Sequence, residues 1–253
     1  MTPSPLRTIV IIPTYNEIDN LSPIVGRIRA AAPEADILIV DDASPDGTGR
    51  LADELAEHDH RVTVLHRTGK RGLGPAYLAG FAAAIRADYD AVVEIDADGS
   101  HDPIDLPAML ELLAVGNDLV IGSRWVPGGA VKNWPAHRQA ISRVGNRYAR
   151  WMLRSSINDL TAGYRAFRTG ALAQVDLDGV SSQGYCFQVE LAWRVERAGF
   201  RVAEHPIIFV ERTAGESKMH AGIVAEALWR VTVWGVLERV RPDRNRSGRT
   251  RDD

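Results

Sequence analysis

The chain has 253 residues, of which 45% are hydrophobic and 25% charged, and this composition fits a globular protein with one large α/β domain. The formal net charge of -3 gives no overall attraction to nucleic acid, so no nucleic-acid partner is expected. The single cysteine, Cys186, excludes an intramolecular disulfide framework and a zinc site built from several cysteines, and it fits a reducing compartment.

The first half of the chain alternates apolar runs with longer amphipathic segments. Strands are predicted at 8–12, 37–40, 62–65 and 91–95, and helices at 18–31 and 75–86, with Pro45 suited to the first turn of a helix after the second strand. This alternation predicts right-handed βαβ crossovers, and therefore an α/β fold whose mainly parallel sheet is flanked by helices. The polar loops after strands one, two and four then share the carboxyl edge of the sheet, where such sheets bind ligands.

The second half is less regular. Helices are predicted at 106–114, 136–154, about 187–198 and 223–240, and extended segments at 119–121, 165–167 and 201–206. The Gly-containing segment 210–218 is expected to form a mobile loop, and the Arg-rich tail 241–253 is expected to be disordered. The helix at 223–240 is apolar on nearly all sides, which is unusual for a helix that faces solvent.

Two aspartates follow the apolar run 91–95 directly. Asp96 and Asp98 are separated by one alanine, and this pattern alone describes an ordinary turn as readily as a site. At a strand tip, however, hard oxygen donors can hold Mg²⁺ or Mn²⁺ against a diphosphate, with substrate oxygens and water completing the coordination. The pair is therefore a candidate metal site.

Other polar residues are expected at the same edge. If the ligand is a nucleotide diphosphate sugar, Asp42 could accept hydrogen bonds from the base or ribose, and Pro13, Tyr15 and Glu17 would form the wall beside it. Arg212 and Lys218 are candidates for closing over the phosphates, although solvated loop charges are an equal alternative.

Two further features are assigned structural roles. The glycine-rich segment 69–74 matches neither the P-loop nor the dinucleotide-binding spacing, so a structural turn is favoured. His101 is interpreted as a loop histidine, because the histidines of the chain show no metal-binding spacing.

Nine segments of the chain resemble, in order and spacing, the polyprenol or dolichol phosphate mannosyltransferases of glycosyltransferase family 2. They are IPTYNE, VDDASPDGT, GLGPAY, DADGSHDP, GSRW, HRQAISRVGN, DLTAGYRAF, GYCFQVE and VERTAGESK. The resemblance covers about residues 7–220 and implies a GT-A (Rossmann-like) fold. It also implies an inverting transfer of mannose from GDP-mannose to a polyprenyl (dolichyl-type) monophosphate, with release of GDP. A catalytic domain is expected at 1–220, with a nucleotide half at about 7–122 and an acceptor half at about 123–220.

The resemblance further implies roles for single residues. The donor and metal site would be lined by Pro13, Tyr15, Glu17, Val40, Asp42, Asp96, Ala97, Asp98, Arg124, Arg212 and Lys218. Arg138 and Ser142 would meet the acceptor phosphate, and together with Asp98 and Arg124 they are the candidate catalytic residues. Ser100 stands where some relatives have glutamine, which leaves open whether it binds Mg²⁺ or Mn²⁺ directly or through water.

A phosphate acceptor changes what the enzyme has to supply. A phosphate monoester, with a second pKa of about 6, is largely dianionic near neutral pH, so no dedicated general base is expected. Arg124, Arg138 and Ser142 are expected to position the acceptor oxygen instead. Glu190 has two interpretations: it orients an arginine or the sugar hydroxyls, or it pairs with Arg194 one turn further on.

The lipid acceptor requires contact with a membrane surface, or with a membrane anchor protein. Direct contact could involve an arginine stripe with two flanking aromatic residues and two tryptophans of the last helix: Arg143, Arg147, Arg150 and Arg154, Tyr148 and Trp151, and Trp229 and Trp234. Core packing and a solvated arginine face are the alternatives. The longest uncharged stretch, 72–85, is shorter than a span of roughly 18 to 20 apolar residues, and no signal peptide precedes the first strand. A cytoplasmic protein on the cytoplasmic face of a membrane is therefore expected.

Three other functions remain open from the sequence. A family 2 enzyme could instead move glucose from UDP-glucose to polyprenyl phosphate. A sugar nucleotidyltransferase also uses a metal at a strand tip, but it usually has a glycine-rich, basic loop where this chain has residues 13–17. A non-catalytic binding module would not need both a metal pair and a separate acceptor cluster.

Overall fold

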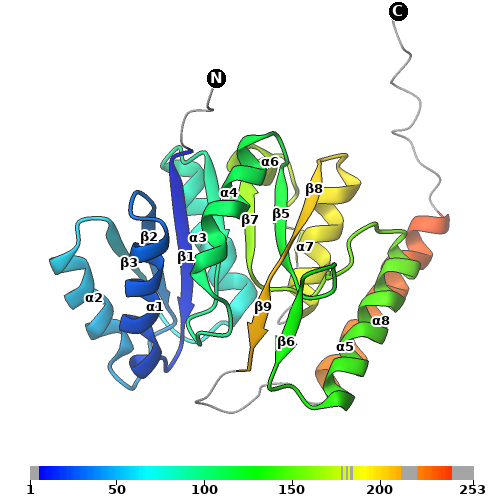
Figure 1. Ribbon diagram of the computed structural model, residues 1–253, viewed down its shortest axis with the longest axis horizontal. Coiled ribbons are helices and arrows are strands. Elements are labelled where there is room, and N and C mark those ends of the chain that lie inside the picture. The colour runs from blue at the N-terminus through cyan, green and yellow to red at the C-terminus, as the bar shows by residue number, and fades with distance from the viewer. Residues whose placement is uncertain (1–5, 178, 181, 183–184, 212–220, 241–253) are drawn as a thin grey trace, which may run out of the picture.

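A seven-stranded sheet with the order β3-β2-β1-β4-β7-β5-β8 lies at the centre of the molecule (Figure 1). The computed structural model describes residues 6–177, 179–180, 182, 185–211 and 221–240. The strands of this sheet are β1 (Thr8–Thr14), β2 (Asp36–Asp41), β3 (Val62–His66), β4 (Ala91–Glu94), β5 (Leu119–Ser123), β7 (Arg165–Arg168) and β8 (Val202–Pro206). All neighbours are parallel except β7, which runs antiparallel to both β4 and β5. The predicted mainly parallel sheet is confirmed.

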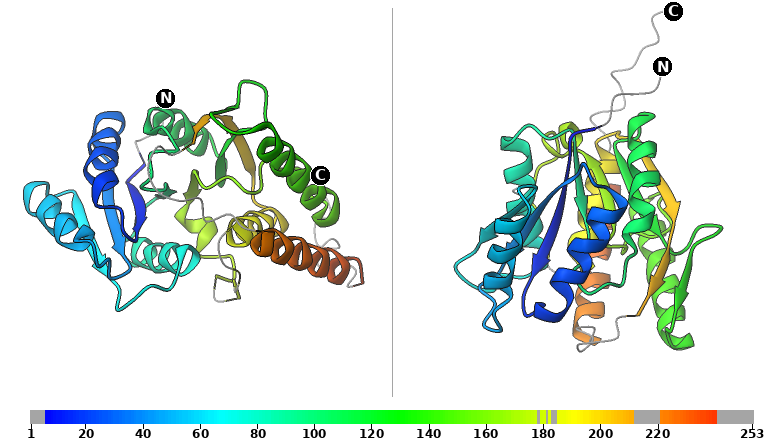
Figure 2. Two further views of the ribbon diagram at one scale, coloured as in Figure 1. Left: turned by 90° about the horizontal axis from the view of Figure 1, so that it is seen from below. Right: turned by 60° about the vertical axis from the view of Figure 1, so that its left-hand side comes forward.

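Helices cover both faces of the sheet and produce three layers (Figure 2). One face packs against α1 (Ile18–Ala31), α2 (Thr48–His58) and α4 (Leu106–Ala114). The other packs against α3 (Leu73–Arg86), α5 (Ala136–Leu153), α6 (Thr169–Leu172), α7 (Tyr185–Arg197) and part of α8 (Ala221–Val240). Because strand side chains alternate between faces, β1 sends Ile9 and Ile11 into one core and Val10 and Ile12 into the other. This burial on both sides explains the continuous apolar runs of the sequence.

The predicted elements differ from the structure mainly where local signals are weak. The helix after β2 begins at Thr48, and Pro45 lies in the preceding loop. The prediction that Pro45 lies in the first turn of this helix is therefore wrong. Asp46 Oδ1 accepts a hydrogen bond from the Thr48 backbone N–H at 3.0 Å, which starts this helix three residues later. The helix α6, the short 3-10 helix η1 (Pro103–Asp105) and the paired strands β6 (Ala130–Lys132) and β9 (Ile208–Val210) were not predicted. Elements of three or four residues are too short to show a periodicity.

Several sequence predictions concern residues that the structure does not describe. Arg212 and Lys218 lie in segment 212–220, and the predicted disordered tail is segment 241–253. In the described part of the chain, no helix is long and apolar enough to cross a membrane.

Candidate functional site

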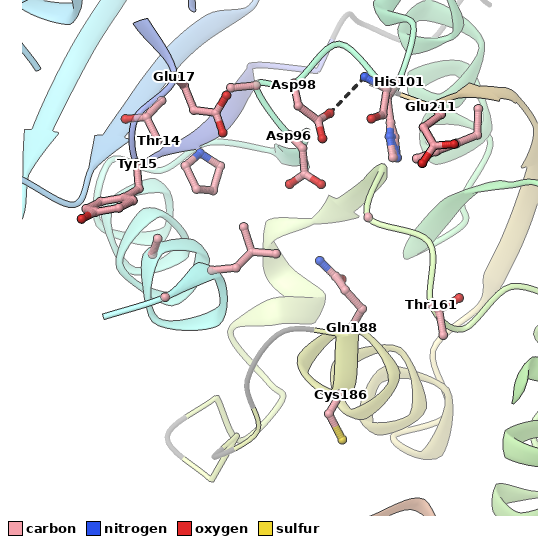
Figure 3. A pocket seen from close by; sticks show the side chains of 18 of the residues that line it. Thr14, Tyr15, Glu17, Asp96, Asp98, His101, Thr161, Cys186, Gln188 and Glu211 are labelled. Atoms are coloured by element: carbon pink, nitrogen blue, oxygen red, sulfur yellow. Dashed lines mark hydrogen bonds between the residues drawn. The ribbon is translucent and has the colours of Figure 1, made fainter. Parts of the chain in front are cut away.

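A cavity of ≈ 550 Å³ lies at the carboxyl edge of the sheet (Figure 3). Its wall combines the loops after β1, β2 and β4 with residues of α3, α5, α7 and β9, so the three polar loops meet as predicted. The predicted site residues in this wall are Pro13, Tyr15, Glu17, Asp42, Asp96, Ala97, Asp98, Ser100, Arg124 and Arg138. Segments from both halves of the chain therefore build one site.

Two described candidates do not line the cavity. The Val40 side chain is fully buried in the core beneath the sheet edge. Ser142 is half-buried on α5, one turn after Arg138, and its backbone carbonyl accepts a hydrogen bond from Asn146 Nδ2 at 3.0 Å.

The two strand-tip aspartates face the cavity (Figure 3). Asp96 Oδ1 accepts a hydrogen bond from the Tyr77 hydroxyl at 3.0 Å, and Asp98 Oδ1 accepts one from the Ser100 backbone N–H at 3.0 Å. Gly99, between Asp98 and Ser100, has a φ of 72°, which glycine adopts without strain. Within the ranges that the structure describes, no cluster of three or more His, Cys, Asp or Glu side chains could hold a metal. A pair of carboxylates fits Mg²⁺ or Mn²⁺ that takes its remaining ligands from a diphosphate and water.

Asp42 organises the loop that follows β3. Its Oδ1 accepts from Arg67 at 2.7 Å, and its Oδ2 accepts from the backbone N–H groups of Arg71 at 2.9 Å and Gly72 at 3.1 Å. These bonds use three of the about four acceptor directions of a carboxylate, so Asp42 keeps room for one further hydrogen-bond donor. Lys70 of this loop lies 4.1 Å above the Tyr15 ring centroid, which brings a positive charge to the cavity.

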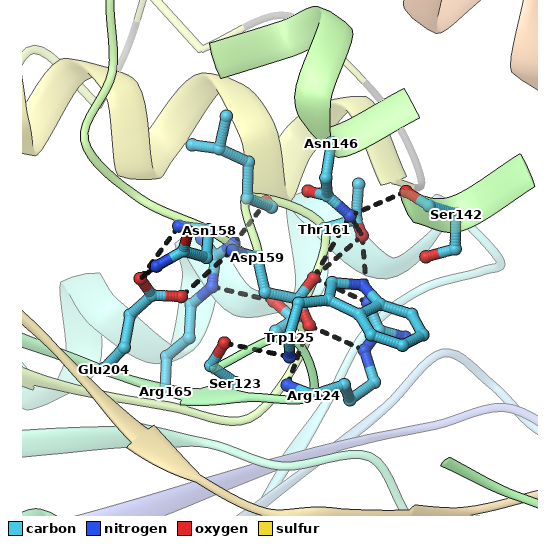
Figure 4. Close-up of polar contacts among 12 residues, drawn as sticks. Ser123, Arg124, Trp125, Ser142, Asn146, Asn158, Asp159, Thr161, Arg165 and Glu204 are labelled. Carbon is cyan, nitrogen blue, oxygen red and sulfur yellow. Dashed lines mark hydrogen bonds and ion pairs between the residues drawn. The ribbon is translucent and has the colours of Figure 1, made fainter. Parts of the chain in front are cut away.

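Arg124 is held by a carboxylate that was not a predicted site residue (Figure 4). Its guanidinium forms a two-pronged ion pair with Asp159, Nε to Oδ2 and Nη2 to Oδ1, both at 2.7 Å, and its backbone N–H donates to the same carboxylate at 3.0 Å. Thr161 accepts a further bond from Nη2 at 2.9 Å. Burial acts to raise the pKa of Asp159, but the Arg124 charge and these hydrogen bonds lower it below its ordinary value. Asp159 belongs to the segment DLTAGYRAF, so the sequence did contain a signal for it.

Arg138 is paired across the cavity wall. It forms an ion pair with Glu211, which follows β9, and its guanidinium carbon lies 4.3 Å from the Trp134 ring centroid. Glu211 also lines the cavity and belongs to the segment VERTAGESK, yet a pairing over 73 positions has no local signature in a single sequence.

His101 lies in the loop after β4, as predicted, and its ring is buried in the cavity wall. It meets the rings of Tyr164 and Phe209 edge-on, at centroid distances of 5.6 and 5.1 Å. Burial lowers the pKa of His101 to about 4, with the positive charge of Arg124 adding to the effect and the negative charge of Asp98 opposing it. The imidazole is therefore neutral near pH 7.

Glu190 has a structural environment. Its carboxylate accepts from Arg194 Nε at 3.0 Å and Nη2 at 2.7 Å, and from the Ser182 hydroxyl. Of the two interpretations, the pairing with Arg194 is the one that the structure contains.

A second set of buried polar groups lies beneath Asp96. Glu94 is fully buried at the end of β4, and burial raises its pKa to about 8 despite the opposing charge of Arg165. Arg165 donates to the backbone carbonyls of Leu160 at 2.8 Å, Ala162 at 2.8 Å and Gln188 at 2.7 Å. It thereby ties the loop that carries Thr161 to helix α7.

Comparison with known proteins gives consistent matches. The family model described as "Glycosyl transferase family 2" matches residues 9–176. The polyprenol monophosphomannose synthase of Mycolicibacterium smegmatis is 54% identical over 235 residues, which is 92% of this chain and 89% of that protein. The undecaprenyl-phosphate mannosyltransferase of Micrococcus luteus is 55% identical over 234 residues, which is 92% of this chain and 96% of that protein.

Solved structures with lower sequence identity share the fold. A mannosyltransferase from Pyrobaculum calidifontis, in complex with GDP-Man and Mn²⁺, is 19% identical with a TM-score of 0.59, covering 96% of this chain and 67% of the other. A glucosyl-3-phosphoglycerate synthase from Mycobacterium tuberculosis, in complex with Mn²⁺, UDP and glucosyl-3-phosphoglycerate, is 18% identical with a TM-score of 0.65, covering 94% and 82%. The solved structures thus show the GT-A fold, and the family model and the two relatives show that the chain belongs to glycosyltransferase family 2.

Proposed function

We propose that this enzyme transfers mannose from GDP-mannose to a polyprenyl monophosphate, with inversion at the anomeric carbon. The observation that carries the proposal is one cavity whose wall contains both the carboxylates Asp96 and Asp98 and the guanidinium of Arg138. The two aspartates suit a metal-bound nucleotide diphosphate, and Arg138 suits a phosphate acceptor. The two mannosyltransferase relatives at 54% and 55% identity support the same choice of sugar and acceptor.

The acceptor supplies its own nucleophile in this reaction. An oxygen of the phosphate dianion attacks the anomeric carbon, forming the new glycosyl–phosphate bond while the bond to the GDP oxygen breaks and its electrons leave with GDP. Arg138, in the wall of the same cavity, would hold the acceptor phosphate in line for this attack. A bound Mg²⁺ or Mn²⁺ would neutralise charge that develops on the departing diphosphate.

Two predicted contributions remain part of this proposal. Arg212 and Lys218 would bind the donor phosphates. Ser142 lies one turn after Arg138 and outside the cavity wall, so it would contact only a part of the acceptor that extends beyond the cavity. Arg124 would act through its charge in the wall, held in place by Asp159.

The direct test is a transfer assay with purified protein, radiolabelled GDP-mannose and a short polyprenyl phosphate, with and without Mn²⁺ or Mg²⁺. We expect metal-dependent labelling of the lipid and a product whose anomeric configuration is inverted by NMR. Labelling from UDP-glucose in preference to GDP-mannose would replace the proposed donor, and labelling only of a soluble acceptor would replace the proposed lipid.

We also propose that the helix pair α5–α8 contacts the membrane surface that holds the acceptor. The two helices lie side by side at one end of the molecule, joined by a hydrogen bond of 2.5 Å between Tyr148 and Thr232 (Figures 1 and 2). Large apolar side chains stay exposed on them, including Val144 at 68%, Trp151 at 68% and Trp229 at 69%. Apolar side chains beside arginines suit the interface of an anionic bilayer.

The structure modifies the predicted contact residues. Trp234 is half-buried and stacks on Trp193 of α7 at 5.8 Å, so it belongs to the packing of α8. Within the arginine stripe, Arg143 lies 4.6 Å over the Trp125 ring, and Arg150 donates to Asn158 at 2.7 Å. Trp151 and Trp229 are therefore the better candidates for insertion into the interface.

A further inference from the structure

One buried hydroxyl points at the metal-binding edge from beneath. Tyr77 on α3 is fully buried, and its hydroxyl donates a hydrogen bond of 3.0 Å to Asp96 Oδ1. No part of its side chain lines the cavity wall, so it would not touch donor or acceptor.

The position of Tyr77 is fixed by two glycines on the same face of α3. Gly74, Tyr77 and Gly80 are three residues apart, a spacing that places them on one side of a helix. A Cβ at Gly80 would lie 2.6 Å from Ile11 Cδ1 of β1, and a Cβ at Gly74 would lie 2.8 Å from Phe187 Cδ2. Gly80 therefore lets α3 approach the sheet, and Gly74 lets it approach α7, more closely than a larger residue would allow.

Aromatic contacts hold the ring itself. The Tyr77 ring stacks on Phe187 at a centroid distance of 6.2 Å and an interplanar angle of 7°, and on Phe81 at 6.2 Å and 21°. Because the ring is confined, its hydroxyl has little freedom to follow another partner.

The hydroxyl acts as the donor in this contact. A phenol is protonated near neutral pH, and a carboxylate oxygen is an acceptor, so the hydrogen bond runs from Tyr77 to Asp96.

We propose that Tyr77 is a positioning residue that fixes the orientation of the Asp96 carboxylate toward the divalent metal, an inference that rests on the proposed function. A hydrogen bond to one oxygen restricts rotation of the carboxylate about its terminal bond, so less conformational freedom is lost when the metal binds with the nucleotide. The glycines and phenylalanines that hold Tyr77 would then act on metal affinity through the Tyr77–Asp96 hydrogen bond.

The experiment compares Tyr77→Phe with the unaltered enzyme. Binding of Mn²⁺ in the presence of saturating GDP is measured from the electron paramagnetic resonance signal of free Mn²⁺, and GDP binding is measured separately in metal-free buffer. We expect Tyr77→Phe to weaken Mn²⁺ binding by about tenfold to hundredfold, the range for partners of metal ligands. The affinity for GDP without metal and the metal-free melting temperature should change little.

Tyr164→Phe is the matched control. Tyr164 is also fully buried, but in the described part of the chain its hydroxyl has no hydrogen-bond partner. Its removal should leave Mn²⁺ binding unchanged.

The outcomes separate this inference from the proposed function. If the unaltered enzyme binds no Mn²⁺ with GDP, the metal-dependent reaction itself is overturned; if it does, and Tyr77→Phe binds Mn²⁺ equally well, only the role of Tyr77 is overturned. Should Tyr77→Phe not fold, Phe187→Leu decides, because it loosens the ring stack and keeps the hydroxyl. A weaker Mn²⁺ affinity of Phe187→Leu supports the proposal, and an unchanged one overturns it.

Discussion

Arg124 and Arg138 bring two positive charges to the cavity, and the structure pairs each with a carboxylate from a distant part of the chain. The two pairs differ in burial. Arg124 is 5% exposed and Asp159 is 0% exposed, whereas both members of the second pair are partly accessible. Loss of Asp159 would remove the carboxylate that compensates the buried charge of Arg124, so the first pair should matter for stability. Arg138 is accessible to a ligand in the cavity, so the second pair should matter for acceptor binding.

Asp159→Asn tests the first pair. Removing one partner of a buried ion pair costs about 3–5 kcal/mol, and we expect a loss of that size in the free energy of unfolding by chemical denaturation near pH 7. Because the pKa of Asp159 is lowered in the folded protein, its contribution is present above the unfolded pKa of about 3.9 and is lost as the pH falls through the lower folded value. The difference between the two proteins should thus be constant above pH 5 and shrink below about pH 4. A difference that grows on acidification would contradict this assignment.

Arg138→Ala tests the second pair. A hydrogen bond to a charged group contributes about 1.5–3 kcal/mol, so kcat/KM for the polyprenyl phosphate should fall by about 10- to 150-fold. The control is Arg50→Ala, because Arg50 is 80% exposed on α2 and approaches Glu54 only at 3.9 Å. Full turnover of Arg138→Ala at limiting lipid phosphate would remove Arg138 from the acceptor site.

The packing of helix α3 depends on a single glycine, Gly80. Gly80 lets α3 lie against β1, and Gly80→Ala would force a methyl group to within 2.6 Å of the Ile11 side chain. Overpacking of this kind costs about 1–3 kcal/mol. Gly26→Ala on α1 is the control, since a Cβ there meets no atom within 4 Å, and it should stabilise the protein by about 0.5–1 kcal/mol through helix propensity. Relative to the unaltered protein, the denaturation midpoint should fall for Gly80→Ala and rise for Gly26→Ala.

The helix pair α5–α8 gives a second prediction at this scale. If Trp151 and Trp229 enter the bilayer interface, replacing either with glutamate should weaken binding to anionic vesicles by about tenfold or more in co-sedimentation, because burial of a large apolar side chain contributes about 1.5–3 kcal/mol. Val115→Glu is the control, since Val115 is 72% exposed at the end of α4. Equal sedimentation of all variants would discard direct contact through these helices and favour a membrane anchor protein.

At the scale of the whole molecule, the sequence predicts the sheet because β1, β2 and β4 are buried on both faces and show continuous apolar runs. The sequence also predicts the edge at which the cavity lies, because the carboxyl ends of parallel strands bring Glu17, Asp42 and Asp96 to the same edge of the sheet. The partners that fix the site were missed. Asp159 lies 35 positions from Arg124, and Glu211 lies 73 from Arg138, so these pairings depend on the antiparallel insertion of β7 and on the β6–β9 pair, which no local pattern announces.

The composition of the candidate metal site predicts how ligands change the stability of the whole fold. Asp96 and Asp98 are the candidate metal carboxylates of the site, and in the described residues they are not part of a larger cluster that could hold a metal without substrate. Mn²⁺ alone should therefore change the melting temperature little, and GDP alone should bind without its metal bridge.

The two together should stabilise the folded state by linkage, by about 2.7 kcal/mol when the ligand is present at 100 times its Kd. Thermal unfolding with GDP, Mn²⁺ or both measures this directly, and EDTA should abolish the increment. Asp98→Asn should lose the combined effect, because an amide lacks the negative charge with which the carboxylate would hold the metal. An increase in melting temperature of equal size with GDP alone would show that the cations of the cavity bind the diphosphate and that the strand-tip aspartates do not. Only a bound metal makes the stabilisation by GDP depend on the presence of Mn²⁺.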